Sequence, residues 1–245
     1  MNTFRLLILP ALLLLMACKK EGSPTPAPDP VPSNFTLKLE HHVDGALLDY
    51  DTLRYINEAG HAFSITRLEY YISGIRLLTA DSSDDDPVIP GPFYINGMAS
   101  NSFDLGAVPL GEYTGATLLL GLPDTLNVTG GLPNTLENVN MAWPVGMGGG
   151  YHFMKFEGHF LNSGLPTGYA MHLGRNENLP QCVLQQPFTV GSSGGTVILH
   201  FNLNEVFRTP HTYDLSSGSY SMGSMTLMAL LSDNCADAFT IACTP

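Results

Sequence analysis

The sequence predicts an all-β fold: an antiparallel β-sandwich or barrel with one short helix near the C-terminus. Two observations support this prediction. Apolar and polar residues alternate along much of residues 35–245, and clusters of glycine, proline, asparagine and aspartate separate the alternating runs. Alternation with a period of two is typical of a strand with one buried face. The length of this region suits a single β domain with a full core.

The first predicted strand is the clearest. Phe35, Leu37, Leu39 and His41 alternate with more polar neighbours before a turn at Asp44. Later strand-like runs, in chain order, are residues 63–78, 113–120, 151–160, 169–173 and 196–203. A turn is expected over residues 204–207. Methionines recur at helical spacing in residues 222–231, which predicts the short helix.

The N-terminus predicts export and lipidation. Residues 1–17 form a signal peptide with one arginine and an apolar run. The segment LMAC, ending at Cys18, resembles the lipobox at which bacterial signal peptidase cuts before a lipid-modified cysteine. Residues 18–34 are rich in proline and favour an extended tether, followed by the β domain, 35–245. We therefore expect a lipid anchor that holds the protein in the bacterial cell envelope, at the outer membrane on its periplasmic side or surface.

Charge excludes one class of partner. The chain has 10 Lys and Arg against 22 Asp and Glu, a formal net charge of -12. Nucleic-acid binding depends on basic clusters that release counterions from phosphates. Nucleic acid is therefore not expected as a partner.

Three cysteines lie beyond the anchor: Cys182, Cys235 and Cys243. In an oxidising envelope two of them would pair, which makes all three disulfide candidates. Sequence spacing leaves the connectivity open, and one thiol stays free or serves another purpose.

Catalytic motifs are not found, so no catalytic residue is assigned and the chain is not predicted to be an enzyme. Residues 191–195 match the G-x-S-x-G pattern of a nucleophile elbow. That motif needs a sharp turn from a strand into a helix. Here it lies in a polar turn between two strand-like runs.

Histidine and methionine residues are the remaining candidates for chemistry. Strict alternation over residues 151–160 puts His152 and Met154 on one face, where imidazole and thioether would suit copper. His41 and His172 lie in other predicted strands, as the ligands of a closed metal site would. The alternative interpretation, that each is a buried residue with an ordinary hydrogen-bond partner, stays open.

Several segments together resemble the MbnP-like copper-binding family of bacterial envelope proteins. They are LKLEHHVDGALL, TRLEYYISGIRLL, MAWPVGMGGGYHFMKFEGHF, MHLG and LNEVFRTPHTYDLSSGSYSMG. These segments occur in the order found in the family and span most of the domain.

The resemblance implies a copper site built from histidines, together with a tryptophan that a dihaem partner enzyme of the MauG-like type oxidises to kynurenine. Matched by motif, the site residues are His41, with His42 as the alternative, Met141, Trp143 and His172. Many family members carry a second tryptophan soon after the first. Here Pro144 and Val145 stand in that region, so Trp143 is the only candidate for modification.

The function predicted from the sequence is thus copper binding, for acquisition, storage or sensing. Two other classes remain open. A non-metal binding module, for carbohydrate or another envelope component, would need an exposed aromatic platform. A metal-dependent enzyme would need an open coordination position and a general base.

Overall fold

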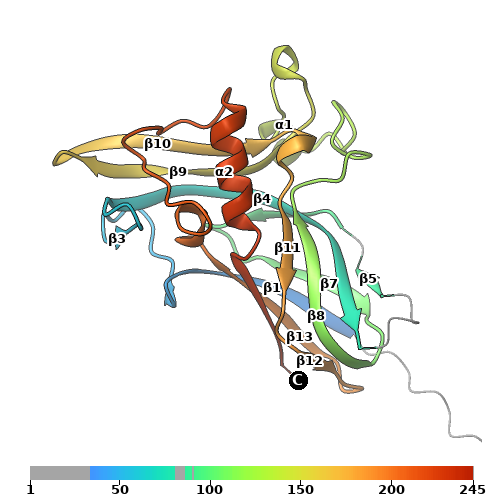
Figure 1. The fold of residues 1–245 in the computed structure, drawn as a ribbon. Helices are drawn as coiled ribbons and strands as arrows, with labels where there is room; N and C mark the ends of the chain where they lie inside the picture. The colour runs from blue at the N-terminus through green and yellow to red at the C-terminus, as the bar shows by residue number, and fades with distance from the viewer. Residues whose placement is uncertain (1–33, 81–85, 90, 245) are drawn as a thin grey trace, which may run out of the picture.

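The computed structural model describes residues 34–80, 86–89 and 91–244. It is a β-sandwich of two sheets with a short helix near the C-terminus, as the sequence predicts (Figure 1). The predicted signal peptide, the lipidation site Cys18 and residues 18–33 of the tether lie outside the described residues.

The smaller sheet has the strand order β14-β13-β1-β2, with β7 beside β1. Burial alternates along β1, whose odd-numbered residues face the interior. One feature differs from the antiparallel prediction: β1 and β13 are parallel. Parallel neighbours need a long crossover, and most of the chain lies between these two strands. The strands are β1 (Asn34–Val43), β2 (Ala46–Leu47), β7 (Ser102–Ala107), β13 (Gly195–Asn202) and β14 (Phe239–Thr244).

The larger sheet has the order β10-β9-β4-β8-β11, and four short strands pair with β4 or β8. Its long central strands β4 and β9 are rich in aromatic residues, which favour strands. The strands are β3 (Tyr55–Ile56), β4 (Ala62–Thr79), β5 (Val88–Ile89), β6 (Phe93–Asn96), β8 (Gly111–Leu120), β9 (His152–Asn162), β10 (Leu165–Gly174), β11 (Gln181–Leu184) and β12 (Phe188–Val190).

Aromatic side chains join the two sheets. Tyr70 of β4 is fully buried, and its ring centroid lies 5.5 Å from that of Phe201 on β13 and 6.4 Å from that of Phe239 on β14. Phe156 of β9 stacks on Phe207 with centroids 5.4 Å apart. These contacts identify the inward face of each sheet, and therefore which residues point outward.

The helix α2 (Met225–Cys235) begins three residues later than predicted and ends four residues later. Ser224 explains the start, because its side chain accepts a hydrogen bond from the Leu227 backbone N–H and so caps the helix. The expected turn at 204–207 is the 3-10 helix η3 (Glu205–Phe207). The short elements α1 (Leu136–Asn140), η1 (Val145–Met147) and η2 (Asn176–Asn178) were not predicted.

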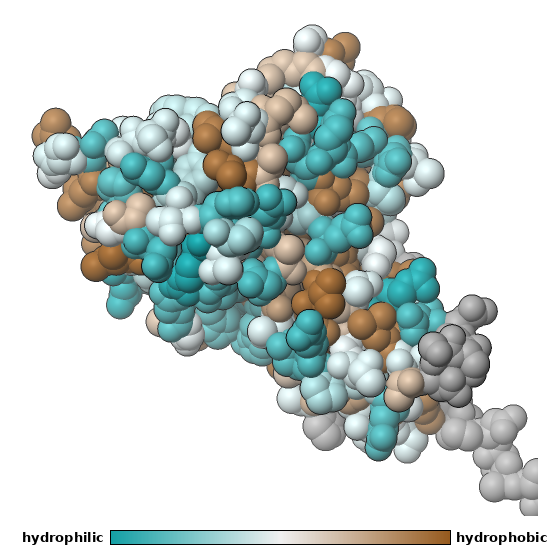
Figure 2. All heavy atoms as spheres, in the orientation of Figure 1, coloured by the Kyte–Doolittle hydropathy of each residue, from teal (hydrophilic) through white to brown (hydrophobic). Residues whose placement is uncertain are grey.

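The face toward the viewer is mostly polar, with small scattered apolar groups (Figure 2). Among the described residues, no helix is both long and apolar enough to cross a membrane.

Candidate metal centre beside Trp143

Strand β9 contains a bulge that decides which residues share a face. Leu173 pairs with Met154, but its neighbour Gly174 pairs with His152, so Phe153 is an extra residue in β9. An extra residue shifts the side-chain alternation by one position. His152 therefore lies on the outward face with His172, whereas Met154 lies opposite Tyr70 on the inward face.

This finding corrects the expectation that His152 and Met154 share a face. The alternation rule holds from Met154 onward, but it fails at the bulge. Met154 is fully buried in the core. The pairing of an imidazole with the Met154 thioether is therefore not found.

A loop before β9 holds Trp143 against His152. The Trp143 backbone N–H donates to the Gly150 carbonyl oxygen at 2.9 Å, and the His152 backbone N–H donates to the Met141 carbonyl oxygen at 2.7 Å. The indole N–H donates to the Met147 carbonyl oxygen at 3.2 Å. Trp143 is 2% exposed, and its ring centroid lies 4.6 Å from that of His152.

The glycine run makes this tight loop possible. Gly148, Gly149 and Gly150 have φ values of 112°, 70° and 84°, a left-handed region that favours glycine. A Cβ atom at Gly150 would lie 2.5 Å from the Asn127 side-chain oxygen. The backbone therefore comes close to Asn127 at this run, and the run closes the loop around Trp143.

His152 and His172 meet edge to face, with ring centroids 5.0 Å apart and an interplanar angle of 88°. Each ring has one nitrogen with a partner. His152 Nδ1 lies 3.0 Å from the Met141 carbonyl oxygen, and His172 Nε2 lies 2.9 Å from the Glu157 carboxylate. Within the described part of the chain, the other nitrogens, His152 Nε2 and His172 Nδ1, are buried and have no hydrogen-bond partner.

These partners determine the tautomers. A carbonyl oxygen only accepts, so His152 Nδ1 carries the proton and Nε2 of the neutral ring has a lone pair. The hydrogen bond from His172 lowers the pKa of Glu157, so this group is an ionised acceptor. In a neutral His172 ring, Nε2 then carries the proton and Nδ1 has the lone pair. Two adjacent imidazoles thus each offer a buried nitrogen lone pair that has no hydrogen-bond partner among the described residues.

Electrostatics keep His152 neutral. Burial lowers the pKa of His152 to about 3. A neutral imidazole is the form that ligates a metal ion. Glu157 also accepts a hydrogen bond from Arg67 at 3.1 Å, so an ion pair fixes the group that orients His172. Such support of a histidine ligand by a carboxylate is common in metal sites.

His41 lies elsewhere. It is buried between the two sheets, and its Nε2 lies 2.8 Å from the Tyr70 hydroxyl oxygen. Because Tyr70 faces inward and His172 faces outward, the larger sheet separates His41 from the Trp143 cluster. Of the residues predicted to ligate copper, the structure brings together Trp143, His152 and His172, with Met141 supplying a backbone oxygen. His41 and its alternative, His42, are not part of this group.

The predicted disulfide is also absent. Cys182, Cys235 and Cys243 are all free thiols. The Cys182 sulfur lies 3.2 Å from the Cys235 carbonyl oxygen, so these two buried residues are neighbours without a bond between their sulfur atoms.

Sequence reasoning missed Glu157 and Arg67. Glu157 lies in the quoted segment MKFEGHF, two residues after Lys155 on the outward face. His172 of β10 is paired with Lys155, and this part of the hairpin is regular. Alternation along β9 would therefore have placed Glu157 on the same face as His172. No such signal exists for Arg67, whose contact depends on the pairing of β4 with β9.

Comparison with known proteins gives two matches to the same family. A family model described as MbnP matches residues 32–226. Among solved structures, MbnP from Methylosinus trichosporium is similar in fold, with a TM-score of 0.56 and 14% sequence identity over 88% of this chain and 100% of that chain. No curated protein matches. Because the family model covers more than half of the sequence, this chain belongs to the MbnP family.

Proposed function

We propose that this protein binds copper between His152 and His172, against the face of Trp143. One observation carries the proposal: His152 Nε2 and His172 Nδ1 are buried lone-pair donors with no hydrogen-bond partner in the described residues. Leaving such groups unpaired costs about 1–3 kcal/mol each. A bound ion removes that cost for both nitrogens at once.

The donor set favours copper. Neutral imidazole suits copper and zinc, and two imidazole ligands are enough for Cu(I), which accepts low coordination numbers. The resemblance in sequence to copper-binding members of the family supports the same ion. Glu157 would hold His172 in the ligating tautomer, and the Met141 carbonyl oxygen would do the same for His152.

Oxidation of Trp143 is the second part of the proposal. Unmodified indole presents only an N–H donor and no lone pair for a metal. Cleavage of the indole C2–C3 bond by a dihaem MauG-like partner, with dioxygen as the oxidant, would add two oxygen atoms to give N-formylkynurenine, and hydrolysis would then release formate. The product, kynurenine, has an aryl ketone and an aromatic amine. Both groups could ligate copper beside His152.

The third part concerns location. The lipobox and the proline-rich tether support a protein anchored in the bacterial envelope by lipid on Cys18. In that place the protein would serve copper acquisition, storage or sensing.

The direct test is an anaerobic Cu(I) titration against a competing chelator. We expect His152→Asn and His172→Asn each to lower copper affinity at least about tenfold, because each removes one lone-pair donor. His159→Asn is the matched control, since His159 lies exposed on the same strand. We also expect His41→Asn to keep its copper affinity, because His41 lies on the other side of the larger sheet.

Two results would contradict the copper site. One is unchanged affinity in both His152→Asn and His172→Asn while far-ultraviolet circular dichroism shows a native fold. The other is a loss of copper affinity in His41→Asn as large as the loss in His172→Asn. That result would mean that copper binds in the interior of the sandwich.

A further inference from the structure

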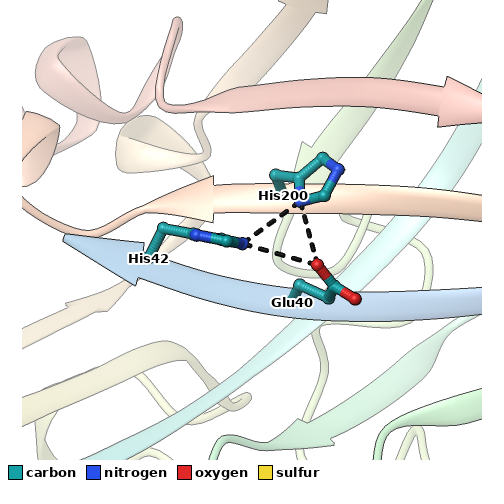
Figure 3. Close-up of side chains that lie close together, drawn as sticks. All are labelled: Glu40, His42 and His200. Atoms are coloured by element: carbon teal, nitrogen blue, oxygen red, sulfur yellow. Dashed lines mark hydrogen bonds and ion pairs between the residues drawn. The ribbon is translucent and has the colours of Figure 1, made fainter. Parts of the chain in front are cut away.

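A second group of metal-ligating side chains lies on the outward face of the smaller sheet. Glu40 and His42 alternate along β1, and His200 lies directly opposite Glu40 on the parallel strand β13. Because Leu39 and His41 of β1 point into the sandwich, Glu40 and His42 point away from it. Figure 3 shows the three side chains turned toward one another above the two strands.

Three ligand atoms form a nearly equilateral triangle. His42 Nε2 lies 3.2 Å from His200 Nδ1, and the Glu40 Oε2 atom lies 3.5 Å from His42 Nε2 and 3.3 Å from His200 Nδ1. A tetrahedral ion with bonds of about 2.0–2.1 Å holds neighbouring ligand atoms roughly 3.3–3.4 Å apart. The side chains therefore already have the spacing of three corners of a tetrahedral site.

Hydrogen bonds alone do not satisfy this triangle when both imidazoles are neutral. If both ring nitrogens donate to Glu40, two N–H groups face each other across the short His42–His200 contact. If His200 donates to His42, a nitrogen lone pair of His42 faces the Glu40 carboxylate. A cation among the three atoms removes both conflicts, because every ligand atom then directs a lone pair toward it.

The surroundings suit an exchangeable cation. Lys38 Nζ lies 2.7 Å from Glu40 Oε1, which leaves the other carboxylate oxygen for the histidines. The side chains of Glu40, His42 and His200 are 23%, 19% and 32% exposed, so the site is half-buried. It borders a pocket of about 500 Å³ that is also lined by Glu205 and Asp237. The pocket leaves room for water or another ligand at a fourth coordination position.

We propose that Glu40, His42 and His200 bind a divalent transition ion of the Zn²⁺ or Cu²⁺ class, at a site separate from the Trp143 cluster. Two imidazoles with one carboxylate suit these ions, whereas a soft thiolate or thioether is not among the three ligands. The two sites lie on the outward faces of opposite sheets. Neither shares a ligand with the other, so each can be tested while the other stays intact.

The experiment is a Zn²⁺ titration by calorimetry of the intact chain, stripped of metal by a chelator. We expect Glu40→Gln and His200→Asn each to weaken Zn²⁺ binding roughly tenfold or more, because each replaces a ligand with a poorer one of similar shape. His211→Asn is the control, since His211 also faces a carboxylate, Asp233 at 3.0 Å, but no third ligand lies beside this pair among the residues that the structure describes. Zn²⁺ affinity in this control should match the wild type.

A Co²⁺ spectrum tests the geometry independently. We expect the intense ligand-field bands of four-coordinate Co²⁺ in the wild type and in His152→Asn, and their loss in His200→Asn. A parallel titration with Cu²⁺ shows which ion of the class binds more tightly. If the bands persist in His152→Asn, the Co²⁺ ion binds at a site separate from the proposed copper site. If the copper proposal is wrong, the Co²⁺ bands of this site are unaffected.

The proposal is overturned if Zn²⁺ affinity and the Co²⁺ bands are the same in wild type, Glu40→Gln and His200→Asn. It is also overturned if His211→Asn loses as much Zn²⁺ affinity as His200→Asn, because binding would then be a general property of surface histidines.

Discussion

Trp143 occupies the space that a side chain at position 174 would need. A Cβ atom built on Gly174 would lie 2.5 Å from Cε3 of the Trp143 indole, closer than real Cβ contacts allow. Gly174 also lies opposite His152 across the β9–β10 pair. The Trp143 indole therefore packs directly against Gly174, the glycine of the MHLG segment.

Substitution at this glycine should disturb the site without touching a ligand. We expect Gly174→Ala to lower the free energy of unfolding by about 1–3 kcal/mol, as is usual for overpacking, and to change the Trp143 fluorescence. Chemical denaturation followed by fluorescence measures both. Gly146→Ala is the control, because a Cβ atom there meets nothing within 4 Å. Equal stability of the two variants would show that the indole has room to move.

Stability should depend on pH through His41. Burial lowers its pKa to about 4 from an ordinary value of 6.5, so the unfolded chain binds more protons between these values. The stabilising contribution is complete above pH 6.5 and is lost as pH falls toward 4. At pH 5 it should amount to a loss of about 2 kcal/mol relative to pH 8.

Denaturation of the metal-free protein at both pH values measures this loss. We expect the difference between pH 8 and pH 5 to be smaller in His41→Asn than in the wild type, by about the same 2 kcal/mol. An identical pH dependence in the two proteins would mean that His41 is solvated or already charged in the fold.

The three thiols should differ in reactivity. Burial raises the pKa of Cys182, Cys235 and Cys243, but Cys243 is only partly buried. In a Cys18→Ser background, an alkylating reagent should label Cys243 in the native protein, and all three after denaturation. Mass spectrometry of the peptides identifies the sites. A disulfide-linked peptide, or native labelling that persists in Cys243→Ser, would go against this expectation.

The anchor is tested by changing the predicted acyl acceptor. We expect Cys18→Ser to remain unlipidated and to leave the membrane fraction, because the acyl chains supply the membrane affinity. Fractionation with immunoblotting measures the distribution. A variant that stays with the membrane, or a wild type that is soluble without detergent, would remove the basis for a lipid anchor.

Modification of Trp143 is tested on protein from its native source. We expect peptide mapping to find the mass of kynurenine at residue 143 and near-ultraviolet absorption that protein made without the dihaem partner lacks. The modified protein should also bind copper more tightly, because the ketone and amine add ligand atoms. An unmodified Trp143 in copper-loaded protein would exclude the kynurenine mechanism and leave the two histidines as the site.

The sequence predicted those parts of the fold that depend on local alternation. The first strand, with Leu37 and Leu39 inward, is confirmed, as are the β-sandwich and the late helix. Helix α1 was not predicted, because it has only five residues and none of them is buried, so it has no apolar periodicity.

The candidate sites depend on features that are less visible in a sequence. Trp143 and His172 could be identified from motifs. The placement of His152 on the same face as His172 could not, because it depends on the bulge at Phe153. His200 was not considered, because the parallel pairing of β1 with β13 brings it to His42 from 158 residues away. Alternation gives the face of each residue within a strand, but not which distant strand is its neighbour.

The bulge in β9 also has a genetic consequence. If Phe153 were deleted, the strand would regain strict alternation, with Met154 still inward opposite Leu173 and His152 still outward opposite Gly174. Every residue of the candidate copper site would still be encoded, in the same order. A frame-preserving loss of one codon at position 153 should therefore leave the two histidines on one face, and a motif that fixes the spacing from His152 to Glu157 would overlook a relative that carries this deletion.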